Sequence, residues 1–196
     1  MISPFIPLPE HFRHRSTVHG QAHVARVMVH ALRLIEATGW EHEASRLWAA
    51  VYLHDLERTR DGHCTRHGAA AVERWEAQEP LQVHLLSGGI TEADYRAIAH
   101  AVDVHCRVEE DEPSRDHPDW PLVALLKDAN ALDRVRLGDL DPSRLRLPQS
   151  RQMVEFAQLL FDVTNGDIPL GAEHFAELTV AADEILNGVA RDDEDD

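Results

Sequence analysis

Apolar residues recur at spacings of three and four along most of this chain, a pattern that predicts helices with one buried face. The expected helices cover residues 19–39, 41–56, 66–78, 80–86, 91–105, 122–137, 151–163 and 173–190. Gly39 ends the first of these helices, and Thr91 is a good N-cap for the fifth. No run of alternating β-branched residues indicates a strand, so the pattern predicts an all-α fold.

Polar, proline-bearing segments separate these helices. The segments at 1–15, 107–120 and 138–149 are the clearest, and each is expected to be a loop. A chain of 196 residues without an internal repeat fits one domain. We therefore expect a single-domain helical bundle of about seven helices over residues 1–190, and a disordered acidic tail over residues 191–196.

The net charge and the cysteines limit the partners and the cellular location that we expect. The formal net charge is −16 and no basic stripe is apparent, which excludes duplex nucleic acid as an expected partner. A small phosphorylated substrate remains compatible, because a bound metal ion inverts the local field. The cysteines Cys64 and Cys106 form no disulfide or metal motif, and neither a signal peptide nor an apolar stretch long enough to cross a membrane is present. We expect a cytoplasmic protein, with a homodimer as the base-rate assembly.

Histidine is the unusual residue in the composition, with 14 copies. His23 follows the apolar face of the first expected helix, His54 and Asp55 follow the apolar run WAAVYL, and Asp128 lies within the apolar helix LVALLKDANAL. An isolated carboxylate in a core carries a large desolvation penalty. Asp55 and Asp128 therefore need compensation, and one metal cation would supply it for both.

The donor set limits the choice of metal. His54 and Asp55 are helix neighbours that point in different directions, but the expected loop after residue 57 puts them at a helix end, where both can reach one ion. Two imidazoles and two carboxylates suit Mn, Fe, Co, Ni or Zn better than Ca. Four protein ligands would leave positions open for water and substrate.

These residues, in this order, resemble the H…HD…D pattern of the HD superfamily of metal-dependent phosphohydrolases. Three segments carry the resemblance: HGQAHVARV at 19–27, AAVYLHDLERTRDGHCTRHG at 49–68, and LLKDANALDRVRLGD at 125–139. Together they span about residues 16–140, with the helices of 151–190 following. The resemblance implies an HD-type helical domain that binds one or two divalent transition metal ions.

The resemblance also implies roles for single residues. His23, His54, Asp55 and Asp128 match the ligands of the first metal. Three further histidines match positions that bind a second metal or the substrate, namely His67, His105 and His100. We expect His67 and His105 to act on the leaving group, whereas Arg58 either binds phosphate or forms an ion pair. Arg58 stands where some members have lysine, and the GYP signature of cyclic-di-GMP phosphodiesterases is absent.

The expected reaction is hydrolysis of a phosphoester or phosphoanhydride in a nucleotide or other small phosphorylated metabolite. Two alternatives stay open. A minority of HD proteins are di-iron oxygenases, and this chain has enough histidines for two irons. The domain could also be a non-catalytic regulatory module that a metal stabilises.

Overall fold

The computed structural model describes residues 5–164 and 174–192, and within these residues the chain is all-α, as predicted. The longer helices occur in the order α1 (Gln21–Thr38), α2 (Ala44–Leu53), α3 (His67–Ala77), α4 (Glu79–Ser87), α5 (Tyr95–Val104), α6 (Trp120–Leu132), α8 (Val154–Thr164) and α9 (Phe175–Asp192). A short helix, α7 (Pro148–Gln152), precedes α8. The connections contain 3₁₀ turns, namely η1 (Pro9–His11), η2 (Glu41–Glu43), η3 (Glu92–Asp94), η4 (Glu109–Asp111), η5 (Asp133–Leu137) and η6 (Pro142–Arg144).

Several predicted helices are shorter than the sequence pattern suggested. The one expected over 41–56 begins as η2 and ends at Leu53, and the one expected over 122–137 becomes α6 followed by η5. At the other end of the chain, α9 continues through Asp192, two residues into the expected acidic tail. Residues 193–196 of that tail lie outside the described residues.

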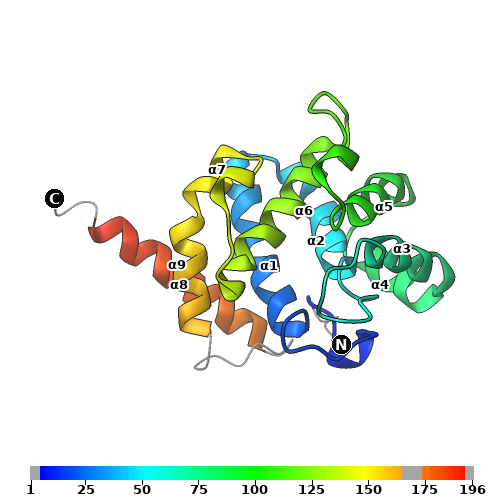
Figure 1. Cartoon of the computed structure of the whole chain (residues 1–196), viewed down its shortest axis with the longest axis horizontal. Helices are drawn as coiled ribbons and strands as arrows, with labels where there is room; N and C mark the ends of the chain where they lie inside the picture. The colour runs from blue at the N-terminus through cyan, green and yellow to red at the C-terminus, as the bar shows by residue number, and fades with distance from the viewer. Residues whose placement is uncertain (1–4, 165–173, 193–196) are drawn as a thin grey trace.

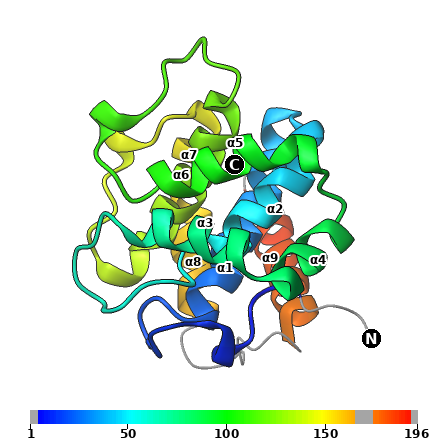
Figure 2. The ribbon, with the colours of Figure 1, turned by 90° about the vertical axis from the view of Figure 1, so that its right-hand side faces the viewer.

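The helices form two groups around a central set. Helices α1, α2 and α6 pack against one another, α3, α4 and α5 cover one side, and α7, α8 and α9 lie on the other (Figures 1 and 2). Helix α6 is buried on nearly all sides, from Leu122 through Leu126 and again at Ala129 and Leu132. A helix that is apolar all round belongs in the interior of a domain. Polar side chains on α6 therefore need partners from both groups.

The core is continuous from α1 to α6. Val24, Val27 and Leu34 of α1 meet the buried faces of α2 and α6. Within the described residues, no helix combines the length and apolar character that crossing a membrane requires.

Candidate metal centre

Three of the predicted ligands come together at the junction of α1 and α2. His23 lies in the first turn of α1, His54 is the C-cap of α2, and Asp55 follows it in the turn that leaves the helix. One donor atom of each residue lies within 4.8 Å of the others, and all three side chains are buried. His54 still has helical backbone dihedrals and donates its N–H to the Ala50 carbonyl, and Asp55 follows in the turn, so the donor atoms of both lie at the end of α2.

In His23 and His54, the hydrogen bond that Nδ1 makes determines which ring nitrogen carries the proton. His54 Nδ1 donates to the Val51 carbonyl at 2.7 Å, and His23 Nδ1 donates to the Asp133 carboxylate at 2.7 Å. In the neutral rings, each Nε2 therefore presents a lone pair. The two Nε2 atoms lie 3.3 Å apart and face Asp55 Oδ2 at 3.4 Å and 3.7 Å. Three electron-pair donors that face one another need a cation among them, either a proton or a metal ion.

Two more histidines face the other oxygen of Asp55. His67 is the first residue of α3 and His105 is the C-cap of α5. Their Nε2 atoms lie 3.0 Å apart, and they are 3.1 Å and 3.9 Å from Asp55 Oδ1. The Nδ1 atom of His105 donates to the Val102 carbonyl at 2.6 Å. The two oxygens of Asp55 thus face two separate pairs of imidazoles.

Electrostatics in the cluster favour a charged Asp55, neutral His54 and His105, and a protonated His67. Burial raises the pKa of Asp55, but the surrounding histidines, His54 foremost, outweigh burial and hold that pKa well below its usual range. Burial lowers the pKa of His54 strongly and that of His105 as well. Burial also opposes protonation of His67, yet its hydrogen bond to Asp55 prevails and raises the pKa of His67 to about 10. A metal ion beside His67 would displace that proton.

Asp133 positions the first imidazole, and the sequence pattern did not single it out. Its buried carboxylate accepts from His23 Nδ1, from Arg26 Nε at 2.5 Å and lies 3.3 Å from Arg136 Nη1. Burial raises the pKa of Asp133, but His23 and Arg26 lower it further than burial raises it. A carboxylate behind a histidine is the usual outer partner of a metal ligand. The available signal was an acidic residue in an apolar helical segment, five positions after Asp128.

The fourth predicted ligand, Asp128, lies outside the group of donor atoms formed by His23, His54 and Asp55. Its carboxylate is fully buried and accepts from the backbone N–H groups of Arg146 and Leu147 at 2.8–3.0 Å. It also accepts from the Ser150 hydroxyl at 2.7 Å. The Asp128 carboxylate thus satisfies the backbone N–H groups just before α7 and ties that segment to α6. Asn130 lines the cavity beside the cluster, and residues two apart on a helix point in nearly opposite directions.

His100 is also outside the cluster. Its Nδ1 atom lies 2.7 Å from Asp119 Oδ2, and with His117 these residues form a separate, partly exposed group at the start of α6. Arg58 lies next to the cluster instead. Its Nε donates to Asp55 Oδ1 at 2.8 Å, so the ion pair that the sequence left as one alternative is present.

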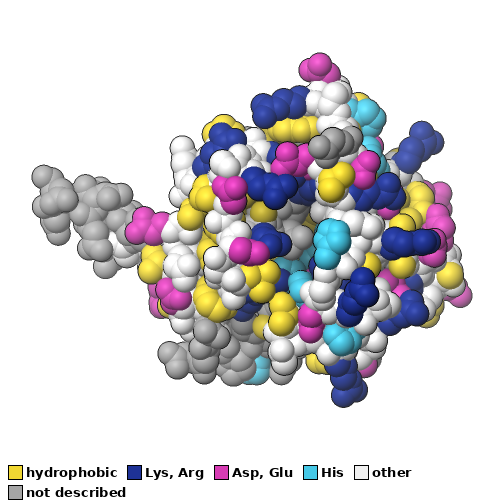
Figure 3. Space-filling view, in the orientation of Figure 1, with side chains coloured by type: hydrophobic (Ala, Val, Ile, Leu, Met, Phe, Trp, Pro, Cys, Tyr) yellow, Lys and Arg dark blue, Asp and Glu magenta, His cyan; other side chains and the backbone are white. Residues whose placement is uncertain are grey.

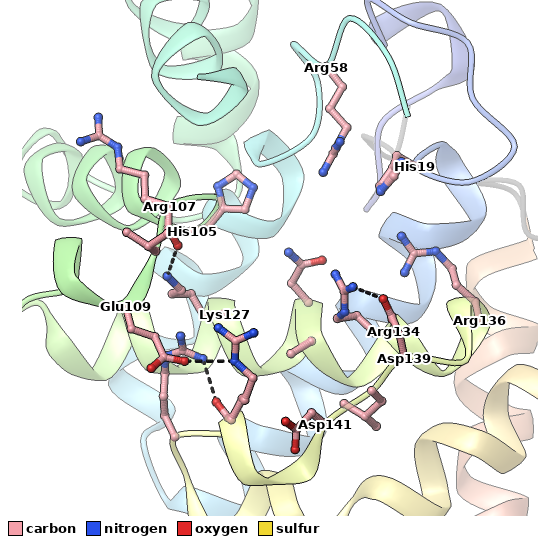
Figure 4. A pocket seen from close by; sticks show the side chains of 16 residues that line it. His19, Arg58, His105, Arg107, Glu109, Lys127, Arg134, Arg136, Asp139 and Asp141 are labelled. Atoms are coloured by element: carbon pink, nitrogen blue, oxygen red, sulfur yellow. Dashed lines mark hydrogen bonds and ion pairs between the residues drawn. The ribbon is translucent and has the colours of Figure 1, made fainter. Parts of the chain in front are cut away.

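A cavity of about 530 Å³ opens beside the cluster. His19, Arg58 and His105 line one part of it. Its cationic lining comprises Arg58, Arg107, Lys127, Arg134, Arg136, Arg144 and Arg146, and its acidic lining comprises Glu109, Asp139 and Asp141. Figure 4 shows Arg58, His105 and Arg134 reaching the cavity from three different segments. On the face seen in Figure 3, Lys and Arg side chains surround a hollow that contains histidine.

Fold and site together define an all-helical protein with a buried histidine–aspartate cluster at the foot of a cation-lined cavity. Comparisons with protein-family models, with curated proteins and with solved structures found no match. The geometry of the cluster and the cavity is therefore what supports a function.

Proposed function

We propose that the protein is a metal-dependent phosphohydrolase of the HD type that acts on a small phosphorylated metabolite. The observation that carries the proposal is the set of lone pairs on His23, His54 and Asp55, which converge without a donor among them. Two imidazole nitrogens on one tetrahedral zinc, each about 2.0–2.1 Å from the ion, stand about 3.3 Å apart. The separation of His23 Nε2 and His54 Nε2 is 3.3 Å.

The remaining donors fit a second ion. Asp55 has one oxygen toward each imidazole pair, so it would bridge ions held by His23 with His54 and by His67 with His105. Bound divalent ions would activate a water molecule and hold a phosphate oxygen. Around them, Asp133 orients His23, and Arg58 holds Asp55 while its guanidinium lines the cavity.

The cavity supports an anionic substrate. The chain is strongly acidic, yet seven of the residues that line this one cavity are Lys or Arg. A volume of about 530 Å³ is ordinary for a small-molecule site. Arginine binds phosphate oxygens through two parallel hydrogen bonds, which suits a phosphoester or phosphoanhydride. Arg58 lines the cavity and also donates to Asp55 of the cluster. We therefore propose that Arg58 contacts the phosphate nearest the metals.

Two other functions use the same donors. A di-iron oxygenase would also place a bridging carboxylate between two imidazole pairs. The density of arginine in the cavity favours phosphate over the neutral substrates that many oxygenations use. A regulatory module would use the metal only for stability. An open, cation-lined cavity next to the donors favours turnover of a ligand over that role.

The test is hydrolysis of a panel of nucleotides, phosphomonoesters and diphosphates by protein reconstituted with Mn, Co, Ni, Zn or Fe. We expect phosphate release that Asp55→Asn abolishes and Arg58→Gln lowers by about 10–100-fold. Arg46→Gln, which removes a cation of α2 outside the cavity, is the matched control and retains activity. Metal-loaded protein that consumes oxygen and releases no phosphate would replace the hydrolase with the oxygenase. Metal that raises thermal stability without any turnover would favour the regulatory module.

A further inference from the structure

Cys106 lies beside the second imidazole pair. One donor atom each of His67, His105 and Cys106 lies within 4.8 Å of the others. The two imidazoles are buried, and His67 Nδ1 has no hydrogen-bond partner. The geometry points to a thiolate-bearing metal site made by His67, His105 and Cys106, with a metal preference that differs from that of the site at His23 and His54.

Close packing of two helices creates this group. Gly68 brings the first turn of α3 against the last turn of α5, and a Cβ at that position would lie 2.1 Å from the Val102 carbonyl oxygen. His67 is the residue before this contact, and His105 and Cys106 follow the end of α5. This close contact therefore brings the start of α3, with His67, next to the end of α5, with His105 and Cys106.

The turn that carries Cys106 is anchored from α6. Lys127 Nζ donates to the carbonyls of Val104 and Arg107, on either side of Cys106, at 3.1 Å and 3.0 Å. Glu112 completes the contacts of this ammonium at 2.7 Å. The sulfur of Cys106 therefore lies on a turn that hydrogen bonds hold in place, and a selective metal site needs ligands held in this way.

The chemistry of the donors sets the preference. Sulfur and nitrogen donors select zinc, and cobalt as its substitute, over magnesium, calcium or manganese. The first site offers only imidazole and carboxylate. When the ion binds, the Cys106 S–H bond is broken, a sulfur–metal bond forms, and the proton leaves to solvent.

Cobalt titration of the metal-free protein, followed by absorption spectroscopy, tests this inference, which rests on the metal-binding part of the proposed function. We expect a near-ultraviolet band for thiolate-to-cobalt charge transfer in the wild type, lost in Cys106→Ser. Cys64→Ser is the matched control, because Cys64 also lies beside His67 but is outside the donor group, and it keeps the band. Cys106→Ser also weakens zinc binding by at least the ~10–100-fold that loss of an outer partner causes.

The outcomes separate the two proposals. Cobalt that binds the wild type without a charge-transfer band overturns the thiolate site and leaves the hydrolase proposal intact. A band that survives Cys106→Ser, or one that Cys64→Ser removes, also overturns it. If the wild type binds no cobalt at all, both proposals fail. Circular dichroism of each variant shows whether the helical fold is retained, and Cys106→Ala serves where Cys106→Ser does not fold.

Discussion

Among single residues, the two buried carboxylates Asp55 and Asp128 are expected to behave in opposite ways. Asp55→Asn removes the charge that faces both imidazole pairs, so metal content falls sharply. Asp128→Asn leaves the cluster unchanged but weakens the hydrogen bonds to Arg146, Leu147 and Ser150. It retains metal and lowers the free energy of unfolding by about 1–3 kcal/mol. Elemental analysis and urea unfolding of both variants check this, and metal loss in Asp128→Asn would contradict it.

The sequence identified His23, His54 and Asp55 because each is a polar residue in an apolar context at a helix end or on a helix face. The same pattern could not separate Asp128 from Asp133. Both are acidic residues in one apolar segment, and both are fully buried. They differ in the partners that the fold supplies. Asp128 accepts from backbone N–H groups of a distant segment, whereas Asp133 accepts from His23. Such partners are set by tertiary packing.

His30 gives the protein a built-in sensitivity to acid. Its side chain is fully buried against Phe156, and neither ring nitrogen has a hydrogen-bond partner. Burial lowers the pKa of His30 to about 4, below its unfolded value of 6.5. The neutral form is therefore favoured in the folded state, and stability from this residue is present above pH 6.5 and is lost as pH falls toward 4.

The replacement His30→Leu removes that dependence. Between pH 6.5 and pH 5, the wild type should lose about 1.5 kcal/mol more of its unfolding free energy than the variant. Denaturant unfolding at both pH values measures the difference. Equal losses in the two proteins would mean that His30 is not the group that takes up the proton.

At the scale of helices, the contact between α3 and α5 decides whether the second imidazole pair forms. Gly68→Ala places a methyl group 2.1 Å from the Val102 carbonyl oxygen, so the start of α3 must move away. We expect a loss of about 1–3 kcal/mol in unfolding free energy, together with loss of the metal ion that we propose binds at His67, His105 and Cys106. Gly188→Ala on α9, where nothing lies within 4 Å, should instead gain about 0.5–1 kcal/mol. Thermal unfolding and metal titration of both variants check the pair.

Apolar periodicity predicted that the helices exist, but it did not predict the residues at which they end. The pattern continues from Leu53 to Leu56 and both residues are buried, yet α2 ends at Leu53. Apolar spacing reports burial, and a turn buries residues as well as a helix does. His54 and Asp55 are the first two residues after α2, so the helix end that periodicity missed is where these two donors lie.

For the whole molecule, the cationic cavity predicts binding of anions that weakens with salt. Inorganic phosphate should bind less tightly as ionic strength rises, because charges near a surface are screened. Arg134, which lines the cavity and forms an ion pair with Asp139, is a suitable probe. Arg134→Gln should weaken phosphate binding roughly threefold and flatten its salt dependence, with Arg46→Gln as the control. Calorimetric titrations at two salt concentrations measure this, and identical slopes would contradict it.

No single segment of the sequence predicts this cavity. Its cations come from the turn after α2, the turn after α5, α6, η5, η6 and the segment that follows η6. In the sequence they are single basic residues in a chain of net charge −16. The fold brings these separate residues together around one cavity, which composition and local sequence did not predict.

The hydrogen bonds of Asp128 determine whether residues 1–140 could fold without the rest of the chain. The residues that resemble a known pattern end near 140, which suggests a separable piece. A fragment cut there would keep the Asp128 carboxylate in its interior and lose Arg146, Leu147 and Ser150, its donors. Such a fragment should not fold by itself, and adding a peptide of residues 141–164 should restore its circular dichroism. On this expectation, the segment that carries the histidine–aspartate cluster would not be an autonomous folding unit, and it would need residues 141–164 to fold.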